Sequence, residues 1–195
     1  MRAGLLALVL GWRLAAGGWR LDPAAVRTAA TTGADAVSTE KRSGAQPPAA
    51  SQPSAVPIRP GSDAGSLARE AGHGRPAVLH FWATWCDACR DEFPRIRKVL
   101  NRLPAQNVGV LLVSIDRPDK LDEVKRDLRR FRVSRLPAVV LDAPDPEPVA
   151  KAVGDPAWDG TLPSTFVFDS GGKLTKSFLG RTGAAALETA VRAVR

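Results

Sequence analysis

The segment WATWCDAC, residues 82–89, contains the only two cysteines of this 195-residue chain. Two residues separate Cys86 from Cys89, and the apolar run Ala77–Trp82 leads into them. That run predicts a buried strand, and a helix is expected to begin at Cys86. This places Cys86 at a helix N-terminus and Cys89 one turn later on the same side. The pair could be a structural crosslink, part of a metal site or a reacting dithiol.

A structural crosslink is a weak explanation, because a ring closed over so few residues removes little entropy from the unfolded chain. The position of Cys86 favours chemistry instead. Free backbone N–H groups and the helix dipole favour a negative charge at a helix N-terminus, which lowers the pKa of a thiol there. The thiolate is the attacking species in thiol-disulfide exchange, so Cys86 is a candidate nucleophile.

Metal binding is disfavoured by the shortage of further ligands. A structural zinc site uses four Cys or His side chains, and His73 and His80 are the only histidines of the chain. His73 lies in a glycine-rich loop, His80 lies in the expected buried strand, and no second CxxC motif is present. The sequence therefore predicts neither a metal site nor another cofactor.

Strands and helices are expected to alternate around this segment. We expect helices over residues 67–71, from Cys86 onward, over 118–131 and from about Gly183, and strands over 77–82, 108–114 and 138–141. Two further strands, 165–169 and 173–178, are joined through Ser-Gly-Gly, a turn sequence typical of a β-hairpin. Such an order predicts an α/β fold with parallel strands and with helices on both faces of the sheet.

The first sixty residues differ from the rest. Residues 1–20 place Arg2 before a short apolar run and then small residues, the order found in a signal peptide or N-terminal anchor. A mis-assigned start or a disordered tail is the alternative. Residues 21–60 are rich in Ala, Ser, Thr, Pro and Gly without apolar periodicity, so we expect a disordered linker there. The folded domain is expected over residues 61–195.

The net charge of the chain is +8, divided evenly between residues 1–60 and residues 61–195. The densest group of arginines lies on and just after the helix expected at 118–131, with acidic residues among them. A solvated helix face explains this group better than a nucleic-acid groove, which would interleave aromatic residues. A docking patch for an acidic partner is the second interpretation.

The residues around the cysteines resemble the active-site segment of thioredoxin-fold proteins. The likeness is carried by FWATWCDACR, residues 81–90, and the following Glu92-Phe93-Pro94 resembles the TlpA-like envelope branch. Later segments match in the same order, at residues 113–116, 162–166 and 169–180. The resemblance covers nearly all of the expected domain. It implies a thioredoxin fold, with a central mixed sheet, helices on both faces, a closing β-hairpin and a C-terminal helix.

The resemblance implies roles for three residues near the motif. Cys86 would be the attacking thiolate and Cys89 the buried thiol that resolves the mixed disulfide, so the two would form a redox-active disulfide. Glu92 matches a carboxylate that the family holds near the resolving cysteine, where it would accept or relay a proton. A surface ion pair with Arg95 is an equal alternative for Glu92.

Three further residues are implied in substrate binding. Pro163 matches the cis proline of the family, which lies against the cysteines and offers backbone to an incoming peptide. A trans turn proline is the alternative. Leu162 precedes Pro163, and Trp85, directly before Cys86, would supply apolar contact for a partner.

The chain departs from the family pattern in several places. His80 stands where cytosolic thioredoxins hold a buried acid, so it would be either a neutral substitute in a proton relay or a hydrogen-bonded core residue. Asp87 opposes a thiolate at Cys86 and Arg90 supports one, so no reduction potential follows from the sequence. An additional segment at 144–160 would form either a partner-recognition wall or a covering helix.

Together these features predict a thiol-disulfide oxidoreductase of the periplasm or cell envelope that reduces disulfides of exported proteins. Its partners would be disulfide-bearing protein substrates and an envelope thiol donor that re-reduces the pair. We expect a monomer with no nucleic-acid partner and with membrane contact only through an N-terminal anchor. A non-enzymatic binding or scaffold module is the alternative. A peroxidatic enzyme is less favoured, because the Thr-x-x-Cys context of such a nucleophile is absent.

Overall fold

The structure is a computed structural model, and it describes residues 55–195. The strands are β1 (Ile58–Pro60), β2 (Ala77–Trp82), β3 (Gly109–Ser114), β4 (Ala138–Asp142), β5 (Ser164–Phe168) and β6 (Leu174–Leu179). The helices are α1 (Ala64–Gly72), α2 (Asp87–Arg102), α3 (Leu121–Arg130), α4 (Pro146–Val153) and α5 (Ala184–Arg192), with 3-10 turns at Gly61–Asp63, Pro104–Gln106 and Pro118–Lys120. No helix in this part of the chain is long and apolar enough to cross a lipid bilayer.

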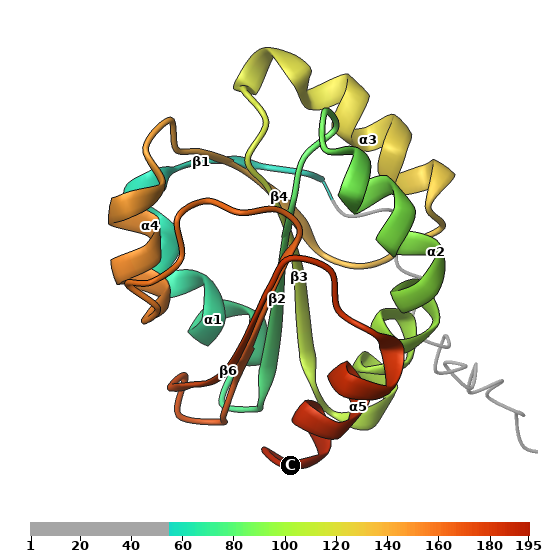
Figure 1. The fold of residues 1–195 in the computed structure, drawn as a ribbon, viewed down its shortest axis with the longest axis vertical. Coiled ribbons are helices and arrows are strands. Elements are labelled where there is room, and N and C mark those ends of the chain that lie inside the picture. The colour runs from blue at the N-terminus through green and yellow to red at the C-terminus, as the bar shows by residue number, and fades with distance from the viewer. Residues whose placement is uncertain (1–54) are drawn as a thin grey trace, which may run out of the picture. The chain divides into compact units, whose positions relative to one another are not determined.

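The six described strands form one mixed sheet in the order β1-β4-β3-β2-β5-β6. The first four strands of this order run parallel, and β5 is antiparallel to both β2 and β6. Helices α1 and α4 cover one face of the sheet, while α2, α3 and α5 cover the other (Figure 1). This arrangement confirms the predicted α/β thioredoxin fold.

Strand β2 lies at the centre of the sheet, and all six of its residues are buried. Its side chains alternate between the two faces, as strand geometry requires. Val78 and Trp82 join the apolar cluster beneath α2, α3 and α5, whereas Leu79 and Phe81 join the cluster beneath α1 and α4. Burial on both faces explains why the sequence of this strand is continuously apolar.

The sheet begins earlier in the chain than the sequence suggests. Residues Ile58–Pro60, assigned to the linker at 21–60, form β1 and pair in parallel with Val140–Asp142 of β4. The folded part therefore starts before residue 61, where the sequence predicts it to start. Three residues at the edge of a sheet carry no apolar alternation, and only their partner strand defines them. The segment predicted at 1–20 and the linker residues up to 54 lie outside the described residues.

The additional segment at 144–160 contains α4 and a buried tryptophan. Asp145 caps α4, since its side chain accepts the N–H of Glu147 at 3.0 Å. Beyond the helix, Trp158 is 3% exposed and packs edge-on against Phe81 and Phe166, with ring centroids 5.0 Å and 5.6 Å away. The segment therefore covers the sheet, as the second of the two interpretations proposed.

Candidate active site

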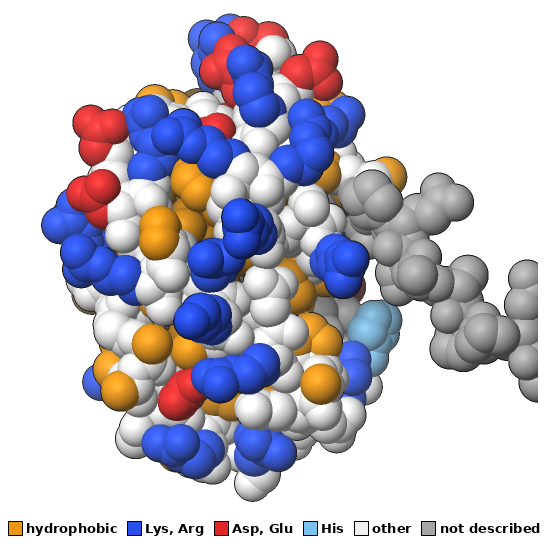
Figure 2. Space-filling model, turned by 90° about the vertical axis from the view of Figure 1, so that its right-hand side faces the viewer, with side chains coloured by type: hydrophobic (Ala, Val, Ile, Leu, Met, Phe, Trp, Pro, Cys, Tyr) orange, Lys and Arg blue, Asp and Glu red, His pale blue; other side chains and the backbone are white. Residues whose placement is uncertain are grey.

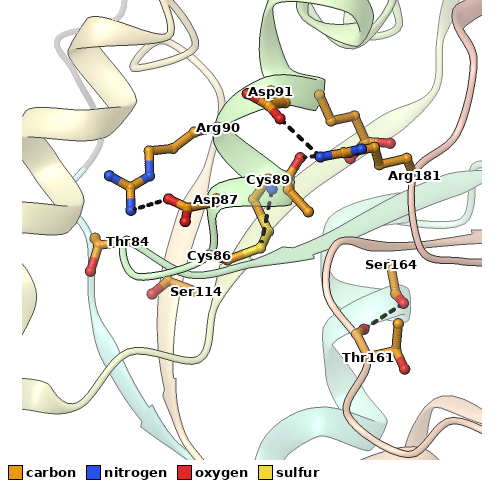
Figure 3. Close-up of a disulfide and its surroundings, with 12 residues drawn as sticks. Thr84, Cys86, Asp87, Cys89, Arg90, Asp91, Ser114, Thr161, Ser164 and Arg181 are labelled. Atoms are coloured by element: carbon orange, nitrogen blue, oxygen red, sulfur yellow. Dashed lines mark hydrogen bonds and ion pairs between the residues drawn. A yellow bond between two sulfur atoms is a disulfide. The ribbon is translucent and has the colours of Figure 1, made fainter.

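The two cysteines lie at the end of the sheet that is formed by the carboxyl ends of the parallel strands, where β2 ends and α2 begins. Because β5 runs antiparallel to β2, its first residue lies beside the end of β2, with Ser164 paired to Phe81. This pairing brings the loop before β5 to the same end of the sheet as the cysteines. Figure 3 shows the disulfide with Asp87 and Arg90 on one side and the loop of Thr161 and Ser164 on the other.

Cys86 and Cys89 are joined by a disulfide, with their Cα atoms 5.3 Å apart. Cys86 is the N-cap residue of α2, and its sulfur accepts the N–H of Cys89 at 3.1 Å. Cys86 is 6% exposed and Cys89 is fully buried, whereas the neighbouring Trp85 is 63% exposed. Of the two cysteines, Cys86 is therefore the one that solvent can reach, and the exposed ring of Trp85 lies beside it in the sequence.

Two ion pairs surround the first turn of α2. Arg90 lies 2.9 Å from the carboxylate of Asp87, so the two charges that act on Cys86 in opposite directions are paired with each other. Arg181, from the loop after β6, lies 2.9 Å from the carboxylate of Asp91. Its Nε also donates to the backbone oxygen of Ala88 at 3.4 Å. The loop before α5 is thus tied to the start of α2.

Asp116 holds the loop that leads to the cysteines, a role that the sequence analysis missed. Its carboxylate accepts the N–H of Thr84 at 2.9 Å, the hydroxyl of Thr84 at 2.6 Å and the hydroxyl of Ser114 at 2.7 Å. Asp116 is 1% exposed, so these bonds replace the hydration of a buried charge. The available signal in the sequence was an acidic residue two positions after an apolar strand, because the carboxyl ends of parallel strands lie together at one end of the sheet.

Glu92 lies in the interior, so the alternative of a surface ion pair with Arg95 is wrong. The residue is 1% exposed, and its Oε1 accepts the N–H of Thr182 at 2.5 Å. Its Oε2 has no hydrogen-bond partner among the described residues. Burial raises the pKa of Glu92 to about 7, although the Thr182 N–H, Arg181 and Arg95 act to lower it. The carboxyl therefore binds and releases a proton near neutral pH.

His80 is a hydrogen-bonded core residue, the second of its two predicted interpretations. It is fully buried, and its Nδ1 lies 2.9 Å from the hydroxyl of Thr165 on β5. Its Nε2 lies 3.8 Å from Oε2 of Glu92, and neither atom has a hydrogen-bond partner among residues 55–195. Burial lowers the pKa of His80 to about 3, so the imidazole is neutral at physiological pH.

The loop before β5 carries the predicted proline. The Leu162–Pro163 peptide bond is cis, the geometry that the resemblance implied. Pro163 is buried and Leu162 is half-buried. The hydroxyl of Ser164 donates to the backbone oxygen of Thr161 at 2.7 Å, which closes the loop on itself.

The two histidines do not assemble with the cysteines. His73 ends α1 with a left-handed backbone and is exposed, whereas His80 is buried in β2. Among the described residues, no group of three or more His, Cys, Asp or Glu side chains is placed to hold a metal ion.

Comparisons with known proteins agree with this geometry. A model of the AhpC/TSA family matches residues 59–177. The thiol-disulfide oxidoreductase ResA of Geobacillus thermodenitrificans is 35% identical over 107 residues, which cover 55% of this chain and 56% of that protein. The sporulation thiol-disulfide oxidoreductase A of Bacillus subtilis is 24% identical over 107 residues, 55% of this chain and 61% of its own. The chain thus spans little more than half the length of these curated relatives.

Solved structures share the fold. A thiol:disulfide interchange protein of the thioredoxin family from Chlorobium tepidum aligns with a TM-score of 0.52 and 21% identity, covering 65% of this chain and 83% of that one. A DsbF homologue from Corynebacterium diphtheriae aligns with a TM-score of 0.53 and 19% identity, covering 62% and 72%. Because the family model matches more than half of the chain, the protein belongs to the AhpC/TSA family, and its fold is that of the thioredoxins.

Proposed function

We propose that the protein is a thiol-disulfide oxidoreductase that reduces disulfides of exported proteins through Cys86 and Cys89. The observation that carries this proposal is the place of Cys86. Its sulfur lies at the N-terminal end of α2 and accepts the N–H of Cys89. Both the hydrogen bond and the helix dipole stabilise a negative sulfur, so they favour the thiolate at Cys86 once the pair is reduced.

The reaction has two exchange steps. The Cys86 thiolate attacks one sulfur of the substrate disulfide, so a mixed disulfide forms and the other substrate sulfur leaves as a thiolate that takes up a proton. Cys89 then loses its proton and attacks the Cys86 sulfur, which releases the second substrate thiolate. Two electrons pass to the substrate and the Cys86–Cys89 disulfide remains. An external dithiol donor in the envelope reduces that disulfide again.

Glu92 would accept the proton of Cys89 in the second step. It follows Cys89 by three residues in α2, so the two side chains lie on the same side of the helix. A buried carboxyl with a pKa of about 7 exchanges a proton near neutral pH at little free-energy cost. This match between pKa and working pH supports an acid–base role for Glu92.

Trp85, Leu162 and Pro163 would hold the substrate. The exposed ring of Trp85 offers apolar area beside the reacting sulfur. The loop of Leu162 and Pro163 lies at the same end of the sheet as the cysteines, where its backbone can pair with an extended peptide.

Reduction is favoured over oxidation by the charges around Cys86. A strong oxidant needs a strongly stabilised thiolate, and here the carboxylate of Asp87 is the adjacent residue while Arg90 is engaged by that carboxylate. Export is supported by the N-terminal apolar segment at residues 3–12. Fractionation of the producing cells, followed by mass spectrometry of the N-terminus, tests it: an intact Met1 in the soluble cytosol would reject export.

The proposed activity is tested by reduction of insulin disulfides with dithiothreitol as donor. The purified chain should accelerate the reaction, and Cys86→Ala should abolish the acceleration. Asp122→Asn, an exposed position on α3, is the matched control and should keep it. Equal rates with the protein and with Cys86→Ala would instead favour the binding or scaffold module.

A further inference from the structure

A groove of about 590 Å³ lies beside the redox pair, between α2 and the end of α3. Four arginines line it, Arg90 and Arg97 from α2 and Arg130 and Arg132 from α3 and the residues after it, together with the carboxylates of Asp87 and Asp91. Figure 2 shows the face that carries α2, α3 and α5. Lys and Arg side chains spread over its middle, and most Asp and Glu side chains lie toward its top and left edges.

The groove has an excess of positive charge. Both of its carboxylates are already paired, Asp87 with Arg90 and Asp91 with Arg181. None of the ion pairs among residues 55–195 involves Arg97, Arg130 or Arg132. Asp127, on the same helix as Arg130, does not line the groove. Three guanidinium groups are therefore free to bind carboxylates of another molecule.

The walls of the groove are held in place by contacts between α2 and the end of α3. The ring of Phe131 stacks on Phe93 with centroids 4.5 Å apart and an interplanar angle of 10°. The amide of Asn101 donates to the backbone oxygen of Arg132 at 3.0 Å, which holds Arg132 in a left-handed conformation with φ of 59°. A groove that is formed before binding costs little ordering entropy when it is occupied.

One end of the groove is lined by residues that adjoin the two cysteines in the sequence. Asp87 directly follows Cys86, and Arg90 directly follows Cys89. From Asp87 to Arg97 the helix rises by about 15 Å. An extended peptide covers that length with about four or five residues.

We propose that this groove binds an acidic segment of the protein substrate, with Asp or Glu within about five residues of the cysteine that Cys86 attacks. This inference rests on the proposed function and names the class of substrate for it. Arginine forks bind carboxylates in pairs of hydrogen bonds, and an excess of positive charge speeds the encounter with an acidic chain. The arginines thereby select which disulfides reach Cys86.

The test compares two disulfide peptides that differ only in their flanking residues, which are Glu in one and Lys in the other. The reduced protein should react with the Glu peptide about tenfold faster at low ionic strength, and the difference should vanish in 1 M salt. The variant Arg97→Glu/Arg130→Glu should reverse the preference. Arg192→Glu/Arg195→Glu, which makes the same charge change at the end of α5, should leave it as it is.

An uncharged disulfide, dithiodipyridine, separates the two proposals. It should be reduced at the same rate by the protein and by both double variants. Failure to reduce it would contradict the proposed function itself. Normal reduction of dithiodipyridine, together with equal rates for both peptides or a preference that survives Arg97→Glu/Arg130→Glu, would overturn the acidic-segment proposal alone. Binding to phosphatidylglycerol vesicles that this variant loses, with no peptide preference, would assign the groove to a membrane surface and overturn it as well.

Discussion

Glu92 and His80 face each other in the interior, and burial shifts their pKa values in opposite directions. Burial raises the pKa of Glu92 from 4.5 to about 7, so the folded state holds this proton more tightly than the unfolded chain. The resulting stability is complete below about pH 4.5 and is lost as the pH rises through 7. Burial lowers the pKa of His80 from 6.5 to about 3. Its contribution is complete above about pH 6.5 and is lost as the pH falls through 3.

These two trends should partly cancel between about pH 4.5 and 6.5, and single substitutions should separate them. In Glu92→Gln, the free energy of unfolding should rise with pH from about 3 to 6.5, without a decline from 6.5 to 8. In His80→Asn, it should fall as the pH rises from about 4.5 to 7. Urea unfolding of the oxidised protein at a series of pH values measures both.

A matched control for this pair is Asp122→Asn, which removes an exposed carboxylate on α3. It should keep the pH profile of the unsubstituted protein. If Glu92→Gln also keeps that profile, the carboxyl of Glu92 does not titrate near neutral pH, and its acid–base role loses its physical basis.

The loop before α2 depends on one buried carboxylate. Asp116 accepts three hydrogen bonds, from the N–H and hydroxyl of Thr84 and from the hydroxyl of Ser114. Asp116→Ala would leave buried donors unpaired and should cost about 3 kcal/mol of unfolding free energy. Thr84→Val removes one of these bonds and should cost about 1 kcal/mol. Denaturant unfolding measures both, and a loss for Asp116→Ala no greater than that of Asp119→Ala at an exposed position would refute the anchoring role.

Two tryptophans, Trp158 and Trp85, differ in burial and should therefore differ in role. Trp158 follows α4 and is 3% exposed, whereas Trp85 is 63% exposed beside Cys86. Trp158→Ala should lower the unfolding free energy by about 3–5 kcal/mol and leave the reduction of dithiodipyridine at its normal rate. Trp85→Ala should leave stability nearly unchanged and slow the reduction of insulin. The opposite assignment of effects would place the recognition surface on the segment at 144–160.

The elements that could be predicted are those whose pattern of apolar residues reflects which of their faces are buried. Strand β2 is apolar throughout because both of its faces are covered, and α2 carries its apolar residues at helical spacing. Strand β1 was not predicted, and helix α4 was predicted only as one of two alternatives for residues 144–160. Ile58–Pro60 is extended because it pairs with β4, and α4 covers α1 and the sheet with only Val149, Ala150 and Val153 fully buried. Contacts distant in the sequence decide both.

At the scale of the whole molecule, the candidate site combines residues that one local motif places with contacts that form only when the chain folds. Cys86 and Cys89 could be predicted, because strand, turn and helix place them from local sequence. The contacts of Glu92 with Thr182 and of His80 with Thr165 span 90 and 85 residues, so no spacing rule reveals them. The sheet order creates these contacts, because it places β5 and β6 next to β2 and brings the loop before α5 to the end of the sheet where β2 ends.

Trapping of the mixed disulfide tests the central claim most directly. The reduced Cys89→Ala variant is mixed with a disulfide peptide at neutral pH, quenched with acid and analysed by mass spectrometry. We predict one adduct, a disulfide between Cys86 and half of the peptide, which persists because no second thiol resolves it. The account would be contradicted if Cys89→Ala formed no adduct, or if Cys86→Ala formed one on Cys89 as readily.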